Sequence, residues 1–166
     1  MQKSQHLLKD GGISSFVITS GFLDSKTNTH RLALLQDNIF LNATRLPNSS
    51  FKQTHTEVLS DIIFLRRTKD KEAFLSKKND SISEKHIQST ESKFLNSLEI
   101  PIIINQEEKT LKINSLFFDS DEYNGDINDK PFLNIFSNAK NTSIGLNQFG
   151  EATIKINKTE NINNLQ

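Results

Sequence analysis

The sequence contains no cysteine, which excludes disulfide bonds, thiolate metal sites and cysteine nucleophiles. It also lacks any apolar run near the roughly 20 residues that a membrane-spanning helix needs. The first ten residues, MQKSQHLLKD, do not contain the apolar segment of a signal peptide. These absences predict a cytoplasmic chain with no membrane partner.

The chain also lacks an excess of positive or negative charge. The chain has 20 Lys and Arg against 20 Asp and Glu, so its formal net charge is zero. Overall charge therefore gives no support to free-standing binding of nucleic acids or membranes. Only 34% of the residues are hydrophobic, and they are unevenly spread. We expect one domain, or a small domain with an appendage, whose first part is ordered and whose remainder is more polar.

No complete catalytic or metal-binding set is visible. The four histidines lie in polar surroundings without metal-ligand spacing, and the motifs of serine hydrolases, phosphate-binding loops and zinc proteases are absent. The acidic stretch 119–125 does not match a calcium loop, because Asn124 takes the glycine position and Lys130 the position of the last acid. We assign no catalytic, cofactor-binding or metal-ligating residue.

The most informative stretch is Ile39–Arg67. It contains two apolar runs, Ile39–Arg45 and Val58–Arg66, on either side of the polar loop Leu46–Glu57. Such runs predict strands that present the loop at one end of a sheet, where function usually resides. Because the loop has no helical periodicity, we favour an antiparallel return of the second strand.

A helix end and a buried strand are predicted before this stretch. Gln2–Lys9 resembles the last turns of a helix, which the Gly11-Gly12 pair ends. Ile13–Thr19 follows as a strand with a nearly continuous apolar centre, typical of strands covered on both faces. We expect it to run parallel to Ile39–Arg45.

The connection between these two strands is predicted to be a helix. Asn28 or Thr29 is suited to cap it, and it runs to about Asp37, with Leu32 and Leu35 facing the sheet. Leu34 is a further candidate for that face.

The rest of the chain divides into three parts. Residues 67–96 are charged and serine-rich, which indicates a solvated helix or a disordered connector. Ile100–Ile104 and Thr110–Ile113 predict a β-hairpin around a polar turn. Residues 145–150 predict a loop with two glycines, Ala152–Ile156 a last strand, and the asparagine-rich tail a frayed end.

Phe51 is an aromatic residue in the polar loop, with Arg45 and Lys52 on either side as candidate phosphate contacts. The residues alone leave two interpretations of Phe51 open. It folds back as a hydrophobic plug, or it provides a stacking platform for a planar ligand or an extruded base.

Four segments together resemble the later part of an adenine-N6 DNA methyltransferase: GGISSFVITSGFLDS, NTHRLALLQDN, NATRLPNSSFK and TEVLSDIIFLRR. The likeness is greatest to the methylase modules of plasmid- or phage-borne methylase–helicase proteins, and it is continuous over about residues 7–67. It implies an α/β fold: the terminal portion of a Rossmann-like sheet, with two parallel strands and one antiparallel, followed by a small β-rich appendage.

The resemblance also implies a site. In the family this loop lines the pocket of the target base, with an aromatic ring at the position of Phe51 against the flipped adenine, and Thr56 and Glu57 would brace it. The implied target-base and DNA loop comprises Arg45, Pro47, Asn48, Phe51, Lys52, Thr56 and Glu57.

Two motifs of the family do not occur in the chain: the Gly-rich loop that binds S-adenosylmethionine, and the Asn/Asp-Pro-Pro-Tyr/Phe motif. The resemblance therefore predicts a fragment of a methylase, as in restriction-modification systems, that binds no S-adenosylmethionine and is inactive alone. Its partners would be DNA, through a complete enzyme, and the missing N-terminal half.

The expected divisions are a methylase part (1–68), a charged connector (69–97) and a β-rich appendage (98–166). The alternative is a non-catalytic binding module that uses the Phe51 loop, or pairs the open edge of Ile13–Thr19 with a methylase half or another protein.

Overall fold

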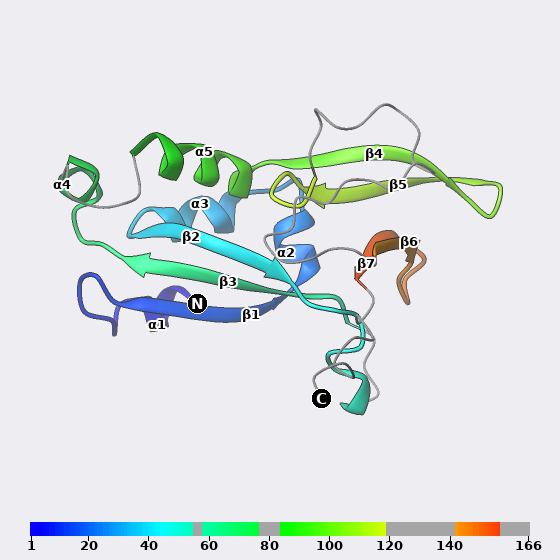
Figure 1. The fold of residues 1–166 in the computed structure, drawn as a ribbon, viewed down its shortest axis with the longest axis horizontal. Coiled ribbons are helices and arrows are strands. Elements are labelled where there is room, and N and C mark those ends of the chain that lie inside the picture. Colours follow the sequence, from blue (N-terminus) through cyan, green and yellow to red (C-terminus); the bar gives the residue numbers. More distant parts are fainter. Residues whose placement is uncertain (55–57, 77–83, 119–141, 157–166) are drawn as a thin grey trace, which may run out of the picture.

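A computed structural model describes residues 1–54, 58–76, 84–118 and 142–156, and it is a mixed α/β fold with two sheets (Figure 1). The first sheet comprises β1 (Ile13–Thr19), β2 (Asn38–Arg45) and β3 (Ser60–Arg67). The second comprises β4 (Ser97–Ile104), β5 (Glu107–Asn114), β6 (Thr142–Leu146) and β7 (Ala152–Ile156). The helices are α1 (Gln2–Gln5), α2 (Ser20–Asp24), α3 (Thr29–Leu35), α4 (Lys71–Ser76) and α5 (Glu84–Leu95), with a 3₁₀ turn, η1 (Lys52–Thr54).

The strand directions in the first sheet agree with the sequence analysis. β3 is antiparallel to both β1 and β2, so β1 and β2 run in the same direction. The strand order is β1-β3-β2, which places β3 between the two and leaves them without hydrogen bonds to each other. The predicted helix is shorter than expected: α1 ends at Gln5 and not at Lys9, so the glycine pair does not end it. Gly11 lies instead in a separate turn before β1 at φ +80°, and its amide donates to the Arg67 carbonyl.

β1 differs from the prediction in its burial. We expected cover on both faces, but the exposure alternates along the strand and the Val17 side chain is 59% exposed. This prediction is wrong because nothing in the described part of the chain packs on the face of β1 that carries Ile13 and Val17. The opposite face, which carries Phe16 and Ile18, packs against the core.

In α3 the prediction for Leu35 and the further candidate Leu34 is confirmed, and the prediction for Leu32 is wrong. Leu34 and Leu35 are buried, whereas Leu32 is 47% exposed. Arg31 on the same helix is buried, and its guanidinium donates to the carbonyls of Phe22, Ser25 and Leu95. These bonds join the α2–α3 connection to the end of α5. The position of α3 is therefore fixed by a buried charged residue, whereas the sequence analysis considered only its leucines.

The charged segment after β3 contributes a core helix. In α5 the buried residues Ile87, Thr90 and Phe94 recur at helical spacing and form one face. The Phe94 ring stacks on Phe40 of β2 with centroids 4.2 Å apart. Of the two alternatives predicted for this segment, a helix or a disordered connector, the structure shows a helix over residues 84–95.

The predicted hairpin is confirmed as β4 and β5. Its turn is shorter than expected, because Asn105 and Gln106 alone form it with φ of 52° and 66°, values typical of a two-residue type I′ turn. Pro101 is tolerated because β4 is an edge strand. β7 is also confirmed and meets β5 in parallel, whereas β6 was missed: residues 142–146 are a strand, and the loop begins only at Asn147.

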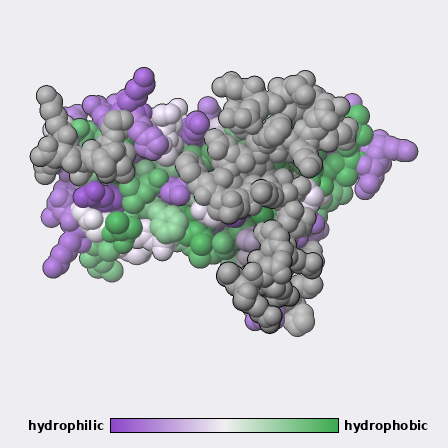
Figure 2. Space-filling view, in the orientation of Figure 1, coloured by the Kyte–Doolittle hydropathy of each residue, from purple (hydrophilic) through white to green (hydrophobic). Residues whose placement is uncertain are grey.

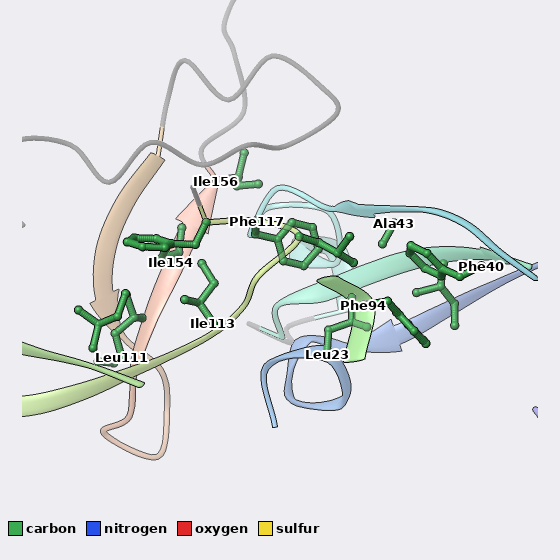
Figure 3. Close-up of a cluster of buried hydrophobic side chains, with 14 of the residues drawn as sticks. Leu23, Phe40, Ala43, Phe94, Leu111, Ile113, Phe117, Ile154 and Ile156 are labelled. Atoms are coloured by element: carbon green, nitrogen blue, oxygen red, sulfur yellow. The ribbon is translucent and has the colours of Figure 1, made fainter. Parts of the chain in front are cut away.

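A single hydrophobic cluster runs from the second sheet through α2 and α5 to the first sheet. Figure 3 shows it continuing from Leu111, Ile113 and Ile154 past Phe117 to Phe94 and Phe40. Residues from all three predicted divisions of the chain share this cluster. Among the described helices, none is both long and apolar enough to cross a membrane.

Candidate functional site

The loop after β2 lies at the end of the first sheet where β1 also ends. Thr19 pairs with Ser60 and Arg45 with Asp61, so both strands finish beside the start of β3. The Asn48 amide donates to the Ile156 carbonyl at 3.0 Å, which ties the loop to β7 of the second sheet. The predicted loop is therefore held by backbone contacts to both sheets.

The structure describes most of the residues predicted for this loop. Pro47, Asn48 and Phe51 are half-buried, and the Phe51 carbonyl accepts hydrogen bonds from the amide and the hydroxyl of Thr54. Lys52 begins η1. Thr56 and Glu57 lie outside the described residues, so the prediction that they brace the loop stays a prediction, as does stacking by Phe51.

Arg45 belongs to the core and is not a phosphate contact in this structure. Its side chain is only 1% exposed, and Nε donates to Asp61 Oδ1 at 2.8 Å. Nη2 donates to both carboxylate oxygens of Asp24 at 2.8 Å, and the guanidinium lies over the Phe117 ring. The prediction for Arg45 is corrected because its side chain is buried, Nε and Nη2 donate to two carboxylates, and an aromatic ring covers its face.

Burial and mutual attraction act in opposite directions in this Asp24–Arg45–Asp61 triad. Burial raises the pKa of Asp24, the Arg45 charge opposes this, and the neighbouring Asp61 charge adds to it. For Arg45, burial lowers the pKa, but the attraction of the two carboxylates outweighs burial and raises it. The guanidinium therefore stays charged, and the triad is a structural element that joins β2, β3 and α2.

A cleft of about 720 Å³ opens at the same end of the first sheet. Its walls come from the end of β1 with the start of α2, the segment before β3, β5, and the turn between β6 and β7. Asn48 lines a small adjoining hollow that shares Leu59 and Asn147 with the cleft, whereas Phe51 lines neither. Of the predicted loop residues that the structure describes, Asn48 thus lies nearest the cleft.

The sequence analysis missed the aromatic residue of this cleft, Phe149. The ring is 77% exposed, the most exposed aromatic side chain among the described residues. Phe149 lies in the loop 145–150 that we singled out for its glycines. The alternation of apolar residues on both sides of that loop was the signal for a hairpin that would have placed it.

No match to the chain was found among models of known protein families, among curated proteins or among solved structures.

Proposed function

We propose that the chain is part of an adenine-specific DNA N6-methyltransferase and carries the loop that faces the target base. The observation that supports this most is the arrangement of the first sheet: a glycine turn leads into β1, helices connect it to β2 in the same direction, and β3 returns antiparallel. The resemblance implies this sequence of elements over residues 7–67. The loop 46–57 leaves the sheet between β2 and β3, as the resemblance requires.

The loop residues that the structure describes support the proposed DNA contacts only in part. Half-buried Phe51 and Asn48 lie in the loop, but Arg45 is committed to its two carboxylates. The Gly-rich cofactor loop and the Asn-Pro-Pro motif do not occur in the sequence. In this proposal the chain contributes to target-base binding, and S-adenosylmethionine and the transfer chemistry belong to another segment.

The chain alone is expected to transfer no methyl group from labelled S-adenosylmethionine to adenine-containing DNA. The DNA upstream of the Met1 codon is expected to encode the two missing motifs, in the same or an adjacent frame. Methylation by the chain alone would contradict the assignment of methyl transfer to another segment. An upstream region without the motifs would overturn the proposal.

One further observation favours a second candidate, a non-catalytic module that binds through the edge of β1. No strand of the described chain pairs with the outer edge of β1. Ile13 and Val17 are exposed on this strand and Leu7 precedes it, and Figure 2 shows apolar side chains along the part of the molecule where β1 runs. An unpaired edge with apolar neighbours is a template for another strand.

This candidate predicts a complex with the polypeptide that the upstream region encodes. Val17→Lys is expected to weaken that complex at least ten-fold, because it places a charge beside the pairing edge. The complex is measured by analytical ultracentrifugation of the co-expressed chains. Ile103→Lys is the matched control, because Ile103 is equally apolar and 70% exposed but lies on β4. A complex that tolerates Val17→Lys would exclude the β1 edge.

A further inference from the structure

The turn between β6 and β7 places Phe149 at the cleft, and its backbone is fixed by hydrogen bonds. Asn147 Oδ1 accepts the amides of Phe149 and Glu151, both at 2.9 Å. The Asn147 amide donates in turn to the Glu151 carbonyl, and Gly150 adopts φ +75°, a conformation that glycine takes without strain. These bonds fix the backbone that carries Phe149, and its ring is 77% exposed to water.

Strand β5 supplies two cations to the same cleft. Lys109 makes a 3.0 Å ion pair with the exposed Glu107, and Lys112 makes no ion pair with any residue that the structure describes. Of the two carboxylates that line the cleft, Asp24 is paired with Arg45, whereas Glu151 accepts a hydrogen bond from the side-chain amide of Asn147 and keeps its charge. The groups open to a ligand are therefore the Lys112 ammonium group, amide and hydroxyl groups and one aromatic face, with the Glu151 carboxylate at the same cleft.

We propose that this cleft binds a nucleotide unit, with the base stacked on Phe149 and the phosphate at Lys112. The volume of 720 Å³ lies within the range of about 300–1,000 Å³ typical of small-ligand sites. An exposed aromatic ring beside lysines is the combination that binds single nucleotides and single strands, because every base has a π face and every phosphate a charge. Gln148 and Thr110, both exposed, offer donors and acceptors for the base edge.

The same chemistry is offered by a free nucleotide and by one nucleotide of a single strand. The proposal does not rest on methyl transfer or on the Phe51 loop, because none of its residues belongs to that loop. Binding is measured for deoxyadenosine monophosphate by calorimetry, and for a labelled single-stranded oligodeoxyadenylate by fluorescence anisotropy. Tight binding of the strand alone assigns a polynucleotide, and comparable binding of the monophosphate assigns a free nucleotide.

Phe149→Ala is expected to weaken binding about ten-fold, the effect of losing one stacked base. Lys112→Gln is expected to weaken binding and to lower the salt dependence of the strand by about 0.7 in the log–log slope, the share of one phosphate contact. Both side chains are exposed, so thermal melting is expected to be unchanged.

The matched controls are Ile103→Ala and Lys85→Gln, which change an exposed apolar and an exposed cationic residue outside the cleft. Equal affinity for deoxyadenosine and its monophosphate would overturn the phosphate assignment. Binding that falls with Phe51→Ala and not with Phe149→Ala would overturn the cleft and favour the loop. Absence of binding by both probes would overturn the proposal and leave the methyltransferase proposal untouched.

Discussion

Replacing Arg45 by methionine is expected to destabilise the folded protein by about 3–5 kcal/mol, the loss typical of removing one partner from a buried ion pair. Arg45 is fully buried between Asp24 and Asp61, at N–O distances of 2.8 Å. Without the guanidinium, the two carboxylates would face each other without a compensating charge. The measurement is urea-induced unfolding of both proteins at neutral pH.

Two controls separate the charge from the volume of the side chain. The triple variant Arg45→Met with Asp24→Asn and Asp61→Asn removes the uncompensated charges, so we expect it to recover much of the lost stability. Lys26→Met breaks an exposed ion pair with Glu99 and is expected to change stability by less than about 1 kcal/mol. An Arg45→Met protein as stable as the Lys26→Met protein would contradict burial of the triad.

The second large effect is expected from Phe94→Ala, at about 3–5 kcal/mol for truncation of a fully buried aromatic side chain. Phe94 is inaccessible to solvent, and its ring stacks on Phe40. Its carbonyl also accepts a 2.9 Å hydrogen bond from the Asn114 side chain at the end of β5. The residue therefore joins α5 to both sheets, and truncation would leave a cavity where they meet.

Phe149→Ala is the matched control for this truncation. It removes the same side chain from an exposed position, so we expect a change within about 0.5 kcal/mol. Both variants are compared by urea-induced unfolding monitored by circular dichroism. Equal midpoints would contradict the packing of α5 on the first sheet.

The strands were the part of the fold that the sequence predicted well. The bounds of β1 and β7 were predicted without error, and those of β2 and β3 to within about two residues, because apolar runs between polar turns carry a local signal. The glycine turn and the β4–β5 hairpin followed from the same local chemistry. Burial was harder to predict, since the cover of a strand such as β1 depends on what packs against each face.

What the sequence by itself determined was therefore the described strands other than β6, the strand directions in the first sheet and the loop that leaves it after β2. Only the tertiary structure decided that Arg45 is a buried core residue, because its partners Asp24 and Asp61 lie 21 and 16 residues away along the chain. It also brought Phe149 of the β6–β7 turn to the same cleft as Lys112 of β5, although the two are distant in sequence. Contacts of this kind depend on packing between elements, so no local sequence pattern predicts them.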